Sequence, residues 1–401
     1  MNKKAILILA VIFFLIVGTL GFLVYSRYTG ENTDTNTPLA GDDLNNGNTD
    51  DLPDNSSSTD VTNLPPTDNF FKLTTTEQVV SPILFYNGNG ITYLTSQGQL
   101  YKSDFDVDTN GQISLTRSRS LDIEAKSGIG RILWPKNGDD FIAEMKGEGG
   151  TNLYTYFNFS TGAYVDLASQ VTSLQWLPSG DKVVFLWTDK NAEGVLKSTL
   201  NIANPDTTGY QTIAEMYETD DVIYVSPDGL NLIYHRTQNE DSTNKLTLTT
   251  PDGKIWRDLV SEGYNYGVLW SPDSQKFLFG KREKSGKNYQ LWVFDLYSGE
   301  IKNLGVYSTP SKAVWSSDSR IIYTAAPKDG QTVSDSDGLN SSFSTDTFYK
   351  LDISTLEKVE FTPENLSIDG RELFLDPSED KLFFKNAQDG GLYYVDLRQQ
   401  N

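Results

Sequence analysis

The sequence predicts an all-β fold, a seven-bladed β-propeller, and three observations support this prediction. First, one pattern recurs along the chain: an aromatic or apolar anchor residue, a polar turn of the S-P-D-G type, and a second apolar run. Second, the anchors are 48, 42, 49, 45, 45 and 60 residues apart, a spacing typical of propeller blades. Third, two more strand-like runs follow, so that one repeat holds the four strands of a blade. Six or eight blades are the alternatives. The anchors are Tyr86, Trp134, Trp176, Val225, Trp270, Trp315 and Leu375.

Within each repeat, the first strand is expected to end at the anchor, where the turn reverses the chain. In S-P-D-G, proline fixes one φ angle, aspartate hydrogen-bonds to the local backbone, and glycine accepts a positive φ. The second strand carries β-branched and aromatic residues, as in residues 276–280 (KFLFG). Four anchors are tryptophans at one register, and we expect them to pack between adjacent blades rather than to form a platform for a sugar.

The ring is predicted to close between the two ends of the repeat region. The seventh repeat ends with three strands, and residues 69–76 (NFFKLTTT) look like the fourth strand that it lacks. We expect this segment to pair with residues 392–397, because a shared blade leaves no long strand edge open. An insertion at residues 327–345 explains the 60-residue interval before the last anchor.

The turn after tryptophan or its equivalent resembles the WD-like repeats of TolB-type propellers and of the propellers in the prolyl oligopeptidase family. The resemblance covers residues 69–401 and implies the fold, but it says little about function, because such propellers serve in scaffolds, in peptidase gates and elsewhere. A peptidase of that family is not expected, since the chain has no G-x-S-x-G motif and its only histidine is His235.

The N-terminus predicts a membrane anchor within residues 1–28. Residues 5–24 carry no charge, and fifteen of these twenty are Ile, Leu, Val or Phe. As a helix they would span about 30 Å, the thickness of the hydrocarbon core. Lys3 and Lys4 keep the short N-terminal side in the cytoplasm. The prediction is a single-pass membrane protein with an extracytoplasmic propeller, and a cleaved signal peptide is the alternative.

Residues 29–68 predict a disordered acidic linker, dominated by Asn, Asp, Thr, Ser, Gly and Pro, between the anchor and the propeller domain at 69–401. The formal net charge of the whole chain is −21. This charge argues against nucleic acid or an anionic lipid surface as a partner, because both bind basic proteins. The only membrane contact expected is the N-terminal helix.

No catalytic motif is present, and we expect a binding or scaffold module of the cell envelope rather than an enzyme. Its partner would be an envelope protein or a polysaccharide. His235 has no second histidine and no cysteine with which to hold a metal, since the chain contains no cysteine. The alternative is a propeller hydrolase or lyase that acts on a glycan through carboxylates converging on the central channel, with calcium as a cofactor.

The segment DVDTNGQIS carries the calcium prediction. Asp106, Asp108 and Asn110 occupy the first, third and fifth positions of a calcium loop, and the Gln112 carbonyl would add a fourth oxygen. Other repeats have a plain turn here, and Arg117 stands where a bidentate glutamate is usual. A simple turn without calcium is therefore the alternative.

The loops between second and third strands carry the prediction of a binding surface, because in a propeller they share one face with the loops that join the blades. One of these loops is basic, and the insertion of the next repeat is acidic. We predict that this face docks a partner, and a solvated hairpin tip or a disordered insertion are the alternatives. The residues concerned are Lys281, Arg282, Lys284 and Lys287 in the basic loop, and Asp335 and Asp337 in the insertion.

Overall fold

A computed structural model of the chain describes residues 61–63, 70–74, 78–85, 87–109, 111–121, 128–136, 140–216, 221–236, 244–283, 288–328, 343–362 and 367–400. The predicted anchor at 5–24 and nearly all of the predicted linker lie outside these residues. In the part of the chain that is described, no helix is long and apolar enough to cross a membrane.

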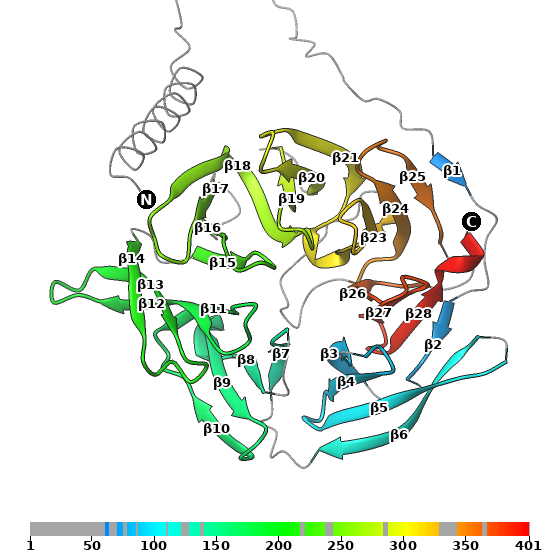
Figure 1. The fold of residues 1–401 in the computed structure, drawn as a ribbon, viewed down its shortest axis with the longest axis horizontal. Helices are drawn as coiled ribbons and strands as arrows, with labels where there is room; N and C mark the ends of the chain where they lie inside the picture. Colours follow the sequence, from blue (N-terminus) through cyan, green and yellow to red (C-terminus); the bar gives the residue numbers. More distant parts are fainter. Residues whose placement is uncertain are drawn as a thin grey trace, which may run out of the picture. The chain divides into compact units, whose positions relative to one another are not determined.

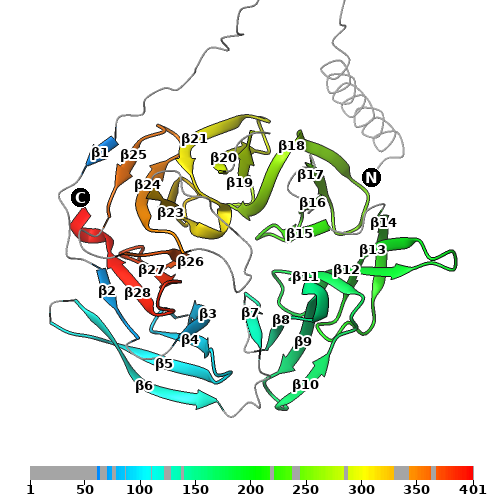
Figure 2. The same ribbon diagram turned by 180° about the vertical axis from the view of Figure 1, so that it is seen from behind.

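Seven blades of antiparallel strands surround a central axis, with the first strand of each blade innermost (Figure 1). The view from behind shows the same closed ring (Figure 2). The predicted all-β, seven-bladed architecture is therefore confirmed.

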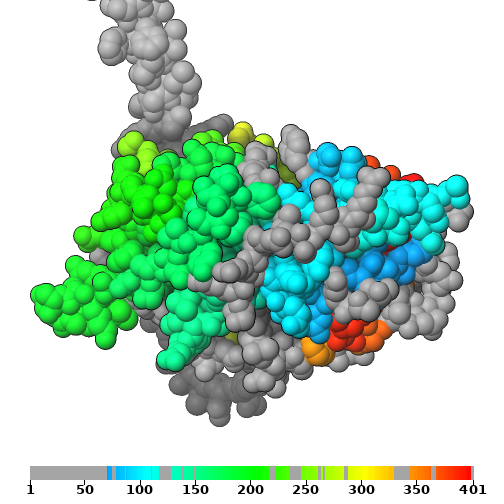
Figure 3. Space-filling view, turned by 90° about the horizontal axis from the view of Figure 1, so that it is seen from below, coloured from blue at the N-terminus to red at the C-terminus, as the bar shows by residue number. Residues whose placement is uncertain are grey.

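The first three blades are separate four-stranded sheets. Blade 1 holds β3 (Val79–Leu84), β4 (Gly90–Thr95), β5 (Leu100–Val107) and β6 (Ile113–Leu121). Blade 2 holds β7 (Ile129–Leu133), β8 (Phe141–Lys146), β9 (Asn152–Asn158) and β10 (Ala163–Asp166), with the short helix η1 (Glu148–Gly150) between β8 and β9. Blade 3 holds β11 (Val171–Trp176), β12 (Val183–Lys190), β13 (Leu196–Ala203) and β14 (Gln211–Met216). The hairpin of β12 and β13 projects from the body of the propeller (Figures 1 and 3).

Blades 4 and 5 are joined by one long strand, β18 (Trp256–Trp270), which is the outer strand of blade 4 and then the inner strand of blade 5. Blade 4 begins with β15 (Asp221–Val225), β16 (Leu232–Arg236) and β17 (Asn244–Thr249), and blade 5 continues with β19 (Lys276–Arg282), β20 (Gln290–Asp295) and β21 (Ile301–Tyr307). The short helix η2 (Pro310–Lys312) leads into blade 6, which holds β22 (Ala313–Trp315), β23 (Ile321–Pro327), β24 (Asp346–Asp352) and β25 (Lys358–Glu360).

The ring closes in blade 7, as the sequence predicts. Blade 7 holds β26 (Gly370–Leu375), β27 (Lys381–Asn386) and β28 (Leu392–Asp396), followed by η4 (Leu397–Gln400). Its fourth strand is β2 (Phe70–Lys72), which pairs antiparallel with β28 so that Phe70 faces Val395. In addition, β1 (Val61–Asn63), which lies in the predicted linker, pairs in parallel with β25 on the outer edge of blade 6.

The anchor tryptophans tie each blade to the one before it. Every one of the four donates its indole N–H to a backbone carbonyl on the inner strand of the preceding blade. The donors and acceptors are Trp134 to Ser81 (2.8 Å), Trp176 to Leu133 (2.9 Å), Trp270 to Tyr224 (3.2 Å) and Trp315 to Leu269 (3.1 Å). The predicted packing between blades is confirmed, and a hydrogen bond at each interface adds to it.

The polar turns also connect neighbouring blades. Gly229 has a positive φ of 72°, as the S-P-D-G pattern predicts, but serine stands at this position in the next two blades. Ser274 and Ser319 keep the positive φ, at 59° and 60°. Their hydroxyls accept hydrogen bonds at 3.0 Å from the backbone N–H of Asp228 and Asp273 in the blades before them. The serine is thus explained by a bond that glycine could not make.

Candidate functional site

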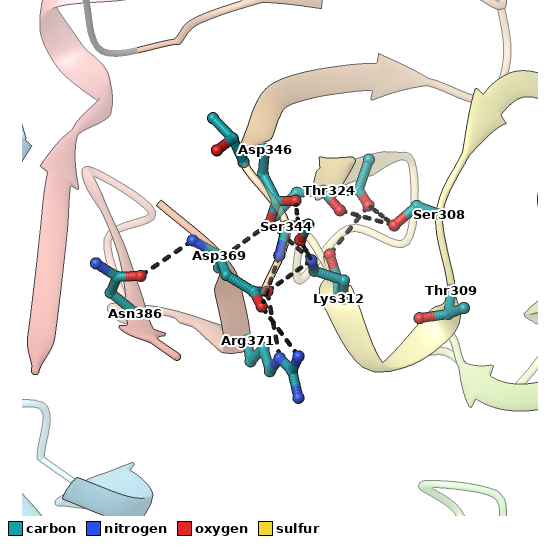
Figure 4. A network of polar contacts seen from close by, with 12 residues as sticks. Ser308, Thr309, Lys312, Thr324, Ser344, Asp346, Asp369, Arg371 and Asn386 are labelled. Atoms are coloured by element: carbon teal, nitrogen blue, oxygen red, sulfur yellow. Dashed lines mark hydrogen bonds and ion pairs between the residues drawn. The ribbon is translucent and has the colours of Figure 1, made fainter. Parts of the chain in front are cut away.

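A buried group of charged side chains lies between blades 6 and 7 (Figure 4). Lys312 ends η2, just before the inner strand of blade 6, and Asp346 is the first residue of β24. Asp369 directly precedes β26, the inner strand of blade 7, and Arg371 lies in that strand. All of them sit where first strands begin and where the second strand leads to the third, which is the face predicted to bind a partner. We call Lys312, Asp346, Asp369 and Arg371 the buried quartet.

Lys312 is the centre of this group. Its Nζ lies 2.7 Å from Asp346 Oδ2 and 2.8 Å from Asp369 Oδ1, and it donates a hydrogen bond of 2.9 Å to Ser344 Oγ. Lys312 is 3% exposed, Asp346 is 2% exposed and Asp369 is fully buried. Because a buried ammonium is stable only when its donors are satisfied, these three contacts explain how the charge is tolerated.

The two carboxylates are held in different ways. Asp369 accepts from Arg371 Nε (3.2 Å) and Nη2 (2.9 Å), one bond on each oxygen. Asp346 has Lys312 as its one cationic partner and also accepts from the Gly370 N–H at 2.7 Å and the Ser344 hydroxyl at 2.7 Å, whereas Asp369 accepts from a neutral donor, the Ser344 N–H, at 3.3 Å. The quartet therefore contains two positive and two negative groups, with Asp369 paired to two cations.

Because of this difference, the pKa values of the two carboxyls are shifted in opposite directions from the ordinary value of aspartate. Burial raises the pKa of Asp346 and outweighs the opposing effect of Lys312. Burial also acts to raise the pKa of Asp369, but the hydrogen bonds and charges of Arg371 and Lys312 outweigh it and hold that pKa below its usual range. Asp369 is therefore the more firmly ionised of the two.

Sequence reasoning missed the buried quartet. Lys312 is separated from Asp346 by 34 positions and from Asp369 by 57, and none of the three belongs to the repeated pattern. The available signals were the position of Asp346 at the end of the insertion and the loss of tryptophan at the last anchor, Leu375. Neither signal identifies a lysine between two aspartates.

The predicted basic loop lies near the quartet, because η2 packs against β19 as well as against β18 and β26. Lys281 and Arg282 are the last two residues of β19, and the charged groups of both lie over aromatic rings. Lys281 Nζ is 5.3 Å from the centroid of Trp292, while the Arg282 guanidinium carbon is 4.6 Å from that of Tyr264 and 5.8 Å from that of Tyr289. The remaining predicted binding residues, Lys284, Lys287, Asp335 and Asp337, lie outside the described residues.

The predicted calcium motif forms the hairpin turn between β5 and β6. Asp108 Oδ1 accepts a 2.8 Å bond from the Gln112 N–H, and the Gln112 carbonyl accepts one of 3.0 Å from the Asp108 N–H. A Cβ on Gly111 would lie 3.0 Å from Arg398 Nη2, so a guanidinium is next to the turn. Asp106 lies in β5, and Asn110 is outside the described residues. These hydrogen bonds are those of a simple hairpin turn, which the sequence analysis gave as the alternative to a calcium site.

Elsewhere among the described residues, no three His, Asp or Glu side chains are grouped as a metal site would require. His235 lies in β16, the second strand of blade 4, as predicted. A cavity of about 380 Å³ lies at the ends of the inner strands of blades 2 to 4, on the opposite face from the quartet. Its lining includes the polar residues Arg131, Lys136, Gln175 and Ser226, and no carboxylate is among the described residues that line it.

Comparison with known proteins shows the fold alone. No protein-family model matches the sequence, and no curated protein matches it. Among solved structures, an oligogalacturonate lyase from Vibrio parahaemolyticus is similar with a TM-score of 0.55 and 12% identity, over 82% of this chain and 93% of that one. An oligogalacturonate lyase in complex with manganese gives a TM-score of 0.53 and 12% identity, over 83% and 96%. The tricorn protease gives 0.49 and 12%, over 84% of this chain and 35% of its own.

Proposed function

We propose that this protein is a non-catalytic binding module of the cell envelope, tethered to the membrane by residues 5–24, which docks an acidic partner protein on one face of its propeller. The observation that carries the proposal is the pair of cations at the end of β19. Lys281 and Arg282 are supported by Trp292, Tyr264 and Tyr289. Cations held on aromatic rings present their charge in a fixed place, and interfaces are enriched in such residues.

The positive charge of Lys281 and Arg282 makes this site selective for an acidic partner. Most of the surface of a protein with a net charge of −21 repels an acidic partner. A local basic patch then determines where such a partner can approach and in which orientation. The resemblance of the S-P-D-G turns to TolB-type repeats agrees with a scaffold role, since those propellers include envelope scaffolds.

A glycan-acting enzyme is the second candidate, and the likeness to oligogalacturonate lyases is the observation that favours it. At 12% identity this likeness supports the fold and not the chemistry. Asp346 and Asp369 of the buried quartet do not support this candidate, because both are buried and bonded to internal donors rather than exposed to a glycan. Release of unsaturated or hydrolysed oligosaccharides from polygalacturonate by the purified protein would favour the enzyme.

The test of the binding module is a crosslinked pull-down from native membranes. The full chain is compared with a double charge reversal, Lys281→Glu with Arg282→Glu. We expect the wild type to recover a specific acidic envelope protein and the reversal to lose at least nine-tenths of it, as about 1.4 kcal/mol is a tenfold change in affinity. A third form without residues 329–342 tests the predicted role of Asp335 and Asp337.

A matched control carries the same change in charge on the other face. Lys254 lies in the turn between the third and fourth strands of blade 4, and Lys302 is the second residue of the fourth strand of blade 5; they pair with Asp252 and Glu300. Reversing both to glutamate should leave recovery unchanged. Equal recovery by the two double reversals, or equal loss, would contradict docking at Lys281 and Arg282.

A further inference from the structure

We propose that Lys312 and Asp346 condense into an amide bond, so that blade 6 carries an internal covalent crosslink between the start of its inner strand and the start of its third strand. This inference is independent of the binding partner. It assigns a self-modification chemistry to the buried quartet, which the proposed function does not use.

Geometry provides the first argument. Lys312 Nζ is 2.7 Å from Asp346 Oδ2, and the two side chains are 4% and 0% exposed. The nucleophile and the carboxyl are thus held in contact with water excluded. Well-oriented groups fixed in this way react as if at very high concentration, which can offset the slow rate of amide formation in solution.

The surroundings provide the roles that the reaction needs. The Gly370 N–H and the Ser344 hydroxyl both donate onto the Asp346 carboxyl, at 2.7 Å each. The Gly370 N–H donates to Oδ2 and would stabilise the oxyanion that forms there on attack, while the Ser344 hydroxyl donates to Oδ1, the oxygen that leaves. Asp369 Oδ1 lies 2.8 Å from the same Nζ on its other side and can accept a proton from it. Arg371 keeps Asp369 ionised for this role and makes it the poorer electrophile.

The step balances without any added reactant. One proton passes from the Lys312 ammonium to Asp346, giving a neutral amine and a neutral carboxylic acid. The amine attacks Cγ of Asp346, the C–N bond forms, and the C–OH bond breaks. Of the three ammonium protons, one stays on the amide nitrogen and two leave with the oxygen as water. Asp369 relays protons between nitrogen and oxygen and ends as the carboxylate with which it began.

The product fits the site as well as the ion pair does. Condensation removes one positive and one negative charge, so the remaining pair of Arg371 and Asp369 is still balanced. The amide N–H can donate to Asp369 Oδ1, and the amide carbonyl can accept from the Gly370 N–H. Burying an amide whose N–H and carbonyl are both hydrogen-bonded costs less free energy than burying an ion pair, because the charged groups lose more hydration.

Peptide mapping of the purified full chain tests this proposal. Trypsin cuts after Lys302, Lys312, Arg320, Lys328 and Lys350, but not after a lysine whose amine is in an amide. We expect residues 303–320 to be recovered joined to residues 329–350, at the sum of the two peptide masses less one water. Recovery of residues 303–312 and 329–350 as separate, unmodified peptides from the folded wild type would overturn the proposal.

Variants assign the roles. Lys312→Arg keeps the charge and should give separate peptides. Asp346→Asn should lose ammonia instead of water and reach the same linked mass as the wild type. Asp369→Asn should remain unlinked, because its proton acceptor is gone, and linkage in this variant would refute the role of Asp369. The wild-type map decides the main question even where a variant fails to fold.

Discussion

Replacing Trp270 with alanine should destabilise the propeller strongly, because this residue joins blades 4 and 5. Trp270 is 7% exposed, and its ring is 5.7 Å from that of Phe277 in an edge-to-face arrangement. Removing a buried tryptophan side chain costs about 3–5 kcal/mol through lost burial and the cavity left behind. The Tyr224 carbonyl would also lose its indole donor, which accounts for about 1 kcal/mol of the total. This is a large part of the 5–15 kcal/mol or so that typically stabilises a domain.

Chemical denaturation followed by circular dichroism measures this change in unfolding free energy. Two further variants separate the contribution of the indole N–H from that of ring packing and provide a control. Trp270→Phe keeps most of the ring but lacks the N–H, so we expect a loss of about 1–2 kcal/mol. Trp256→Ala is the control: this ring is 42% exposed, bonds to the Gly253 carbonyl in its own turn and contacts the Tyr234 ring of its own blade at 5.5 Å, so it should cost about 1 kcal/mol. If Trp270→Ala and Trp256→Ala shifted the midpoint equally, tryptophan packing between blades would not be the source of stability.

Two further predictions concern acid stability and ring closure. Burial of Asp352 acts against its charge, but hydrogen bonds from Arg320 and Ser354 outweigh this and lower its pKa from 3.8 to about 2. Because the folded pKa is depressed, the advantage of the wild type over Asp352→Asn should be complete above pH 3.8 and vanish as the pH falls to about 2. A difference in unfolding free energy that persists unchanged at pH 2 contradicts this. A chain that begins at residue 76 lacks β2 and leaves β28 as an open edge, so it should lose the cooperative thermal transition that a chain beginning at residue 64 retains. Identical melting curves for the two chains would show that closure by β2 is dispensable.

The fold was predictable because each of its determinants is local or recurs at a regular interval. The anchor, the turn and the following strand lie within about a dozen residues of one another, so pattern and turn chemistry specify them without tertiary information. Ring closure was also accessible, since the missing fourth strand of the last repeat had a matching segment at 69–76. The continuous strand β18 was not, because the sequence gives no sign that the outer strand of blade 4 runs on into blade 5.

The candidate site was only partly predictable, for a physical reason. The basic loop is a local feature of charge, and Lys281 and Arg282 lie where the repeat register places them. The aromatic rings beneath them were not predicted, although Tyr264 lies on the strand that ends at the anchor Trp270 and faces Arg282 across the hairpin with β19. The calcium site at Asp106, Asp108, Asn110 and Gln112 stays a prediction: its spacing is local, and in the turn Asp108 and Gln112 exchange hydrogen bonds.

The buried quartet occupies one of the interfaces that have no tryptophan anchor. Blades 2, 3, 5 and 6 each donate an indole N–H to the preceding blade. Blade 7 has Leu375 at the same register, which fills apolar space but has no N–H to donate. There the turns are joined by the Ser317 N–H, which donates to Glu379, and at the other end of the inner strand the Gly370 N–H bonds to Asp346 and Lys312 bridges to Asp369. Blade 4, whose anchor is Val225, also uses a contact away from its anchor, from the Ile223 N–H to the Ser173 hydroxyl at 3.3 Å. A covalent bond within the quartet would reinforce blade 6, which flanks the interface with blade 7.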